Sequence, residues 1–191
     1  MVDFVEIGTS DFDALCQTHS GSGLVIEPLK FYLDKLPNRP NQTKLNIAIS
    51  ACDCETTVDI YYIPPSIIEE KKLPEWLKGC NSINRPHPAH SDYPYYVKDT
   101  VQSRPLWKVL EENNITEIGH LKIDTEGMDC KILQLYGIYL LDKPYKPKRI
   151  TFEANYLTHA DEINKTLKLY ESMGYREYKR EDSNIILRYY G

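Results

Sequence analysis

Short apolar runs alternate with amphipathic segments along the chain. Residues 2–7 form such a run, which ends abruptly at Gly8-Thr9-Ser10-Asp11 and predicts a buried strand that leads into a helix. Further runs predict buried strands at residues 24–26, 45–49, 120–123 and 150–152. Because strands this apolar cannot be half exposed, the pattern predicts an α/β fold with a mostly parallel sheet covered by helices on both faces.

The segments between these strands have a helical spacing of apolar residues. We expect helices over residues 10–19, 28–36, 103–113 and 128–136, and a last helix that carries residues 163–170. Ser103 is the expected cap of the third helix, and Gly137 and Gly174 are the expected ends of the last two. Residues 175–180 and 185–190, joined by a short polar turn, predict a closing antiparallel β-hairpin.

Residues 50–104 interrupt this regular pattern with a segment rich in proline and tyrosine. Residues 58–62 alternate as a hairpin strand does, residues 67–76 allow a short broken helix, and the rest is expected to be loop. Long loops in compact domains are usually covers or binding loops. We therefore expect a single domain over residues 1–191, in which residues 52–103 are an inserted cover for a substrate.

The composition is that of an ordinary globular domain, with 41% hydrophobic and 27% charged residues. Acidic residues outnumber basic ones by 28 to 23, a net charge of -5, and the absence of a basic cluster argues against a nucleic-acid partner. No apolar run approaches the roughly 20 residues that cross a bilayer. The first residues are acidic where a signal peptide is basic, so we expect a cytoplasmic protein, either complete or a domain of a larger one.

The five cysteines, an odd number without a regular framework, are expected to be reduced thiols. Cys52 and Cys54, followed by Cys80, His87 and His90, could supply zinc ligands, but their spacing matches no finger or ribbon pattern. We therefore expect no metal site, and we interpret both histidines as residues of an exposed loop that are candidates for a base or a metal contact.

Polar side chains stand at the ends of the predicted strands. They are Glu6 with Gly8, Glu27, Ser50, Asp124 with Glu126, and Glu153 with Asn155. Ligands of open α/β sheets bind beyond the carboxyl ends of the strands, so these side chains are expected to surround a binding site. Solvated turns or helix caps would explain the same residues without a ligand.

The spacing of the first two acids indicates a nucleoside ligand without phosphates. Glu27 follows Glu6 by 21 positions (27 − 6), close to the roughly 20 that separate a glycine turn from a ribose-binding acid. The first turn is poor in glycine, and Asp11 and Asp13 would repel a pyrophosphate. S-adenosylmethionine fits better, with Glu27 at its ribose, residues 48–51 at its adenine and Glu6 at its ammonium. An NAD-dependent oxidoreductase and a non-catalytic binding module that retains the fold are the alternatives.

Four segments carry a recognisable pattern. They are Asp3-Phe4-Val5-Glu6-Ile7-Gly8, Val25-Ile26-Glu27-Pro28, Asn46-Ile47-Ala48-Ile49-Ser50 and Leu121-Lys122-Ile123-Asp124-Thr125-Glu126-Gly127-Met128-Asp129. Together they resemble the FkbM family of S-adenosylmethionine-dependent methyltransferases. The resemblance implies a Rossmann-like class I methyltransferase fold, with a seven-stranded sheet whose last strand is antiparallel, and S-adenosylmethionine as cofactor. This chain departs from the family at Phe12, where a second glycine is usual.

The resemblance also implies roles for the residues at the strand ends. Asp124 and Glu126 would stand between the cofactor and the methyl acceptor. The candidate cofactor-binding residues are Glu6, Gly8, Thr9, Ser10 and Asp11 of the first turn, Glu27 and Pro28 beside the ribose, Ser50 beside the adenine, and Asp124.

FkbM relatives are similar to O-methyltransferases that act on hydroxyls of sugars and polyketides, so the expected acceptor is a hydroxyl of a sugar, a glycan or another small metabolite. An alcohol nucleophile benefits from a general base. Asp124 is the first candidate, followed by Glu126, Glu153 and His159, because each comes after a strand end. Glu126 could instead stabilise the N-terminus of the next helix, and His159 could be a solvated residue at a helix start.

Overall fold

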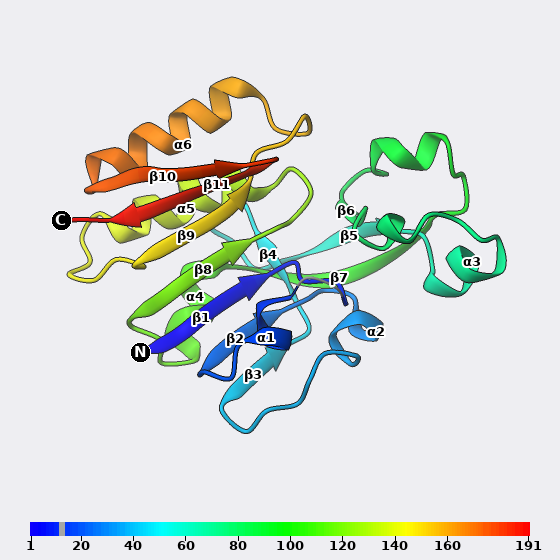
Figure 1. Ribbon diagram of the computed structural model, residues 1–191, viewed down its shortest axis with the longest axis horizontal. Helices are drawn as coiled ribbons and strands as arrows, with labels where there is room; N and C mark the ends of the chain where they lie inside the picture. Colours follow the sequence, from blue (N-terminus) through cyan, green and yellow to red (C-terminus); the bar gives the residue numbers. More distant parts are fainter. Residues whose placement is uncertain (12–13) are drawn as a thin grey trace.

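The computed structural model describes residues 1–11 and 14–191, and a seven-stranded sheet forms its centre (Figure 1). The strand order is β10-β11-β9-β8-β1-β2-β3. Every neighbouring pair is parallel except for β11, which is antiparallel to both β9 and β10. The strands are β1 (Val2–Ile7), β2 (Gly23–Ile26), β3 (Gln42–Leu45), β8 (Ile118–Ile123), β9 (Arg149–Glu153), β10 (Tyr175–Glu181) and β11 (Asn184–Tyr189). This confirms the predicted mostly parallel sheet and its closing hairpin.

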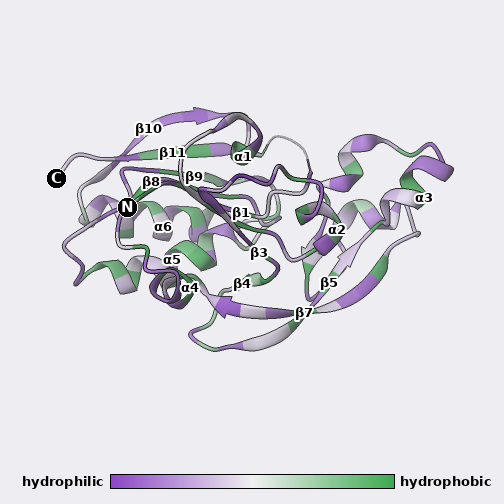
Figure 2. Cartoon of the chain, turned by 90° about the horizontal axis from the view of Figure 1, so that it is seen from below, coloured by the Kyte–Doolittle hydropathy of each residue, from purple (hydrophilic) through white to green (hydrophobic). Residues whose placement is uncertain are grey.

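Helices cover both faces of this sheet because its buried strands are apolar on both sides. On one face, Val5 and Ile7 of β1 belong to the main core. That core is completed by helices α4 (Leu106–Glu112), α5 (Asp129–Leu140) and α6 (Ala160–Ser172), which lie together below the central strands in Figure 2. On the other face, Phe4 packs with Cys16 of α1 (Leu15–Thr18) and Leu33 of α2 (Lys30–Leu33). Burying such a side chain contributes about 1.5–3 kcal/mol.

A second, four-stranded sheet is formed by the segment that was expected to be largely loop. Its strand order is β4-β7-β5-β6, with β5 and β7 paired antiparallel from Thr56 opposite Ser103 to Tyr62 opposite Val97. The elements are β4 (Ala48–Ser50), β5 (Thr56–Tyr62), α3 (Pro65–Glu70), η1 (Glu75–Lys78), β6 (Ser82–Ile83), η2 (Pro88–Ser91) and β7 (Val97–Pro105). Residues 52–103, which we call the insertion, lie on the side toward which the arrows of β1, β8 and β9 point (Figure 1).

Three predicted boundaries are wrong for identifiable reasons. The single strand expected at 45–49 is divided after Leu45, because Asn46 turns to donate its side-chain amide to the carbonyl oxygens of Glu27 and Pro28. Ser103 caps no helix, since it lies in β7 and α4 begins after Pro105. Gly137 lies inside α5, where a Cβ would be 2.7 Å from Cδ2 of Leu169 on α6. Because Gly137 has no Cβ, α5 and α6 can approach each other closely at this point.

The first two helices are shorter than expected, with four residues each. Phe12 and Asp13, which were assigned to the first helix and to the repulsion of phosphate, lie outside the described residues. No helix within residues 1–11 and 14–191 combines the length and the apolarity that a membrane span requires.

The cysteines differ from the expectation of five reduced thiols. Cys52 and Cys54 are joined by a disulfide in the loop between β4 and β5, whereas Cys16, Cys80 and Cys130 are free and buried. Burial raises the pKa of each free thiol, so these three behave as small apolar residues of the interior.

Candidate active site

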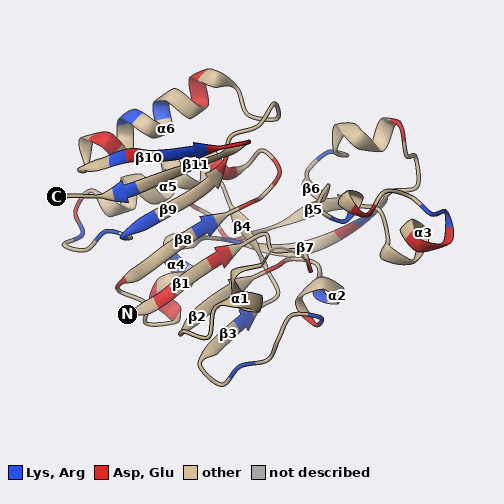
Figure 3. Cartoon of the chain, viewed as in Figure 1, with Lys and Arg blue, Asp and Glu red and all other residues tan. Residues whose placement is uncertain are grey.

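A cavity of about 350 Å³ lies at the carboxyl ends of β1, β2, β8 and β9. This is the edge of an open α/β sheet at which ligands bind. The main sheet contributes the turn after β1, the segment after β2 and the acids that follow β8 and β9, while the insertion covers the other side. In Figure 3, acidic segments lie at the carboxyl ends of both β8 and β9. The predicted clustering of strand ends around one site is therefore present.

Gly8 allows the turn after β1 to pass directly against the end of β8. Its φ is +74°, and a Cβ at this position would lie 1.8 Å from the carbonyl oxygen of Asp124. The backbone N–H of Asp124 donates to the carbonyl of Ile7 at 2.9 Å, which fixes the two strand ends together. Thr9 and Ser10 continue the turn as buried residues that line the cavity. Gly8, Thr9 and Ser10 thus lie where the sequence places them.

Glu27 is a buried carboxylate that faces the cavity from the end of β2. Only 3% of it is exposed. Its Oε2 accepts the backbone N–H of Ser10 at 3.0 Å, and its Oε1 accepts that of Leu29 at 2.8 Å. Burial raises the pKa of Glu27 to about 7, although the donated backbone hydrogen bonds oppose this shift. Pro28 lines the cavity beside it.

Two acids of the predicted cofactor site are directed elsewhere. Glu6 is fully buried, but its carboxylate accepts the backbone N–H groups of Leu15 and Cys16 at 2.8 and 3.3 Å and pairs with Lys122 at 3.2 Å. It therefore anchors the start of α1 and does not line the cavity. Asp11 forms an ion pair with Lys35 at 2.8 Å and is likewise absent from the cavity wall.

Ser50 and His159 are also displaced from the roles expected of them. The hydroxyl of Ser50 is occupied by the backbone of Cys52, and residues 47–49 line the cavity in its place. His159 is exposed at the start of α6 and makes no capping hydrogen bond through its side chain. It does not line the cavity, so the structure does not bring it together with the other candidate bases, and its exposure fits the alternative of a solvated residue at a helix start.

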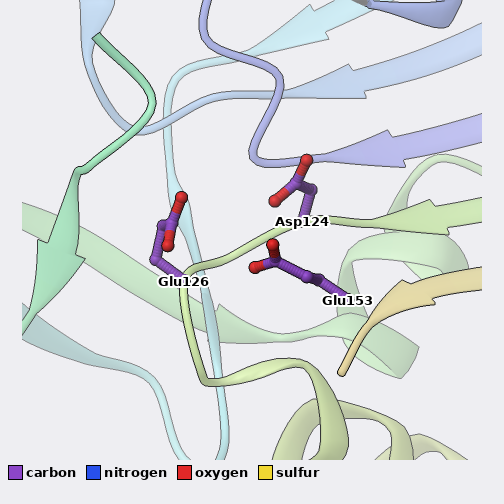
Figure 4. Close-up of side chains that lie close together, drawn as sticks. All are labelled: Asp124, Glu126 and Glu153. Atoms are coloured by element: carbon purple, nitrogen blue, oxygen red, sulfur yellow. The ribbon is translucent and has the colours of Figure 1, made fainter. Parts of the chain in front are cut away.

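Asp124, Glu126 and Glu153 form a cluster that we call the acidic triad (Figure 4). Each has a carboxylate oxygen within 4.8 Å of the others, and all three line the cavity. Asp124 and Glu126 come from the turn after β8, and Glu153 is the last residue of β9. A single cation could bridge these oxygens, although acidic groups of this kind also occur without one.

The triad is electrostatically unfavourable when all its members are ionised. Burial, followed by the charges of Asp129, Glu153 and Glu126, raises the pKa of Asp124 to about 8. Burial and the charges of Glu126 and Asp129 raise the pKa of Glu153 to about 7. At neutral pH the site therefore holds protons that a positively charged ligand would displace.

Asp129 is a functional residue to which the sequence interpretation assigned no role. It is fully buried. One carboxylate oxygen accepts the backbone N–H of Glu153 at 3.0 Å, and the other accepts the N–H and hydroxyl of Thr125 at 3.1 and 2.7 Å. Asp129 thereby joins the turn after β8 to the end of β9 and sets the triad's geometry. An acid in the first turn of the predicted helix was the available signal.

The insertion contributes a histidine where an exposed loop was expected. His87 is 4% exposed, lines the cavity and places its Nε2 3.3 Å from Oε2 of Glu126. His90 is also buried, but it stacks on Tyr96 and does not line the cavity. Cys52 and Cys54 are bonded to each other, and the acidic triad is the one potential metal-holding group among residues 1–11 and 14–191.

Comparison with known proteins identifies a family for this chain. No curated protein and no solved structure gives a significant match. Residues 6–177 match the family profile described as the methyltransferase FkbM domain, which confirms the resemblance seen in the strand-end motifs. Since this match spans well over half of the sequence, the chain belongs to the FkbM methyltransferase family.

Proposed function

We propose that the protein binds S-adenosylmethionine and methylates a hydroxyl oxygen of a sugar, a glycan or another small metabolite. The observation that carries this proposal is the acid-lined cavity at the carboxyl ends of β1, β2, β8 and β9. Membership of the FkbM family favours methyl transfer over hydride transfer to or from NAD. The glycine-poor turn after β1 supports the same choice, since a pyrophosphate needs several free backbone amides.

The residues of the cavity fit this cofactor. Glu27 is held by two backbone amides on oxygens that retain lone pairs for the two ribose hydroxyls. Residues 47–49 offer an apolar surface for the adenine, and Gly8, Thr9 and Ser10 border the amino-acid end. The acidic triad favours a ligand that carries positive charge and no phosphate. Glu6, Asp11 and Ser50 are not part of this assignment because their polar groups have other partners.

S-adenosylmethionine, when bound, supplies an electrophilic methyl carbon whose bond to sulfur breaks, with its electron pair retained by sulfur. The protein's part is to align the acceptor, exclude water and remove the hydroxyl proton. The cover formed by the insertion serves the first two tasks. A carboxylate of the acidic triad serves the third, since all three line the same cavity.

Aromatic side chains at the edge of the cavity support a sugar or a similar ring as the acceptor. Trp76 and Tyr156 both line the cavity, yet 53% and 78% of their surfaces are exposed. The ring of Trp76 is held edge-on by Tyr93, with 6.2 Å between centroids. Exposed aromatic faces of this kind provide apolar surface for the C–H face of a sugar.

Methyl transfer is tested with tritium-labelled S-adenosylmethionine. The full-length protein is incubated with fractionated glycans and small metabolites of the source organism, and label is followed into each fraction. The proposal predicts base-stable label on a carbohydrate or another hydroxyl-bearing fraction. Label that is confined to amines would contradict O-methylation, and the absence of transfer to any fraction would favour a binding module without catalysis.

A further inference from the structure

We propose that His87 is a positioning residue that orients the Glu126 carboxylate as the general base for the acceptor hydroxyl. This inference rests on the proposed methyl transfer and assigns an active-site role to the insertion. His87 lies between β6 and η2, far in sequence from the turn after β8. Its imidazole nevertheless reaches Glu126, so the insertion contributes more than a cover.

The hydrogen bond that the ring of His87 accepts determines which ring nitrogen carries the proton. Its Nδ1 accepts the backbone N–H of Ala89 at 3.1 Å, so the lone pair of that nitrogen is already used. A neutral ring must then carry its proton on Nε2, the atom that lies 3.3 Å from Oε2 of Glu126. His87 therefore places the nitrogen that carries its proton within ion-pair distance of the carboxylate. It is unsuited to act as a base itself, since neither nitrogen offers a free lone pair.

The backbone of Glu126 is held in a conformation that directs its side chain into the cavity. Its φ is +52°, and Gly127 follows with a φ of +93°. A Cβ on Gly127 would lie 3.0 Å from that of Leu157, so the turn packs closely against the segment after β9. A non-glycine residue at positive φ is uncommon and often marks a functional site. Figure 4 shows the resulting approach of the Glu126 carboxylate to Asp124 and Glu153.

This arrangement gives the two oxygens of Glu126 different tasks. Oε2 lies 3.3 Å from Nε2 of His87, which leaves Oε1 for the substrate proton. The acceptor O–H bond breaks as that oxygen takes the methyl group, and the proton moves to Oε1 of Glu126.

The tautomer of His87 and its contact with Glu126 are tested without any methyl acceptor by long-range 1H–15N NMR of the histidine ring nitrogens in the full-length protein. We expect His87 to be a neutral Nε2–H tautomer, with a shift of its Nε2 resonance in Glu126→Gln. His90→Phe is the matched control, because this neighbouring buried ring does not touch Glu126 and phenylalanine preserves the stacking on Tyr96. An Nδ1–H tautomer, or an Nε2 resonance that does not shift in Glu126→Gln, overturns the proposal.

The positioning role is tested by single-turnover methyl transfer to the acceptor fraction labelled by the wild type. His87→Ala should lower kcat by ten- to a hundredfold while the calorimetric Kd for S-adenosylmethionine changes less than twofold. His87→Gln should restore most of the rate, since its amide can donate from the position of Nε2, and His90→Phe should match the wild type. An unchanged kcat in His87→Ala, or no recovery in His87→Gln at an unchanged melting temperature, contradicts the proposal. A wild type that neither binds the cofactor nor transfers label identifies failure of the proposed function instead.

Discussion

The two walls of the cavity are built in different ways. The cofactor wall consists of Gly8, Thr9, Ser10, Glu27, Pro28 and residues 47–49, most of them in short turns after strands of the main sheet. The insertion wall consists of Trp76, residues 79–81 and His87, which are positioned by the second sheet. The first wall depends on local sequence and buried strands, whereas the second depends on pairings between residues far apart in the chain. We infer that the first wall binds the cofactor and that the second determines the acceptor.

Gly8→Ala should have the largest effect, because it removes the contact between the cofactor wall and β8. The added Cβ would overlap the carbonyl of Asp124, and alanine tolerates the positive φ poorly. We expect the free energy of unfolding to fall by more than about 2 kcal/mol in urea titrations. Gly191→Ala, which adds only ordinary van der Waals contacts at the chain end, should leave it unchanged. Equal stability of both variants would show that the turn after β1 accommodates the added Cβ without cost.

Glu27→Ala changes the cofactor wall alone and should weaken the binding of S-adenosylmethionine. Loss of two hydrogen bonds to a charged acceptor, each worth about 1.5 kcal/mol or more, weakens binding by roughly a hundredfold. The calorimetric Kd for S-adenosylmethionine measures this directly. Asp34→Asn is the control, because this exposed acid of the same segment pairs with Lys30 at the surface. Unchanged affinity in Glu27→Ala would place the ribose elsewhere.

The acidic triad, which lies between the walls, should make cofactor binding depend on pH. A bound cation favours the ionised carboxylates and lowers their pKa values, so binding at pH 7 should release protons. Affinity should rise between about pH 6 and pH 8 and then level off, because Asp124 and Glu153, with pKa values of about 8 and 7, are then already ionised in the free protein. Calorimetry in buffers of different ionisation enthalpy counts the protons. Proton uptake would contradict the assignment of a cationic ligand.

The same carboxyls should reduce the stability of the free protein as pH rises. Their pKa values in the folded state lie above the ordinary values of 3.8 and 4.5, so the folded state binds more protons than the unfolded state between these limits. This contribution to stability is complete below about pH 4 and is lost as the pH passes through 7 and 8.

Trp76→Ala should have the smallest effect on cofactor binding and act on the acceptor alone. We expect the KM for the acceptor fraction to rise about tenfold, because an aromatic contact worth roughly 1–1.5 kcal/mol is lost. The Kd for S-adenosylmethionine should stay within twofold of the wild type. Tyr178→Ala, an exposed aromatic residue on β10, provides the control. A large loss of cofactor affinity in Trp76→Ala would show that the insertion wall also holds the cofactor.

Much of the cofactor wall could be predicted because its signals are local. Apolar runs located the strands of the main sheet, and the glycine and acids that follow them located the cavity. The error at Glu6 is instructive, since Glu6 and Glu27 look equivalent as acids at strand ends. Glu6 lies two residues after Phe4, so it points to the face of the sheet that α1 covers. The alternation of side chains between the two faces of a strand could therefore have shown that Glu6 points away from the cavity.

The insertion wall could not be predicted because no local pattern specifies it. Strand β7 is largely exposed and carries polar residues on both sides, so it lacks the hydrophobic period of a half-buried strand. Its pairing with β5 joins residues between 35 positions apart (Tyr62 and Val97, 97 − 62) and 47 positions apart (Thr56 and Ser103, 103 − 56). His87 lies in the connection between β6 and η2, and no pattern in the neighbouring sequence predicts its burial or its approach to Glu126.

The central claim is that the acid-lined cavity binds a cationic adenosyl cofactor. Calorimetric titration of the full-length protein with S-adenosylmethionine, and separately with NAD, tests it most directly. We predict saturable binding of one S-adenosylmethionine per chain with proton release at pH 7, and no measurable heat with NAD. Binding of NAD alone, or of neither compound, would contradict the account.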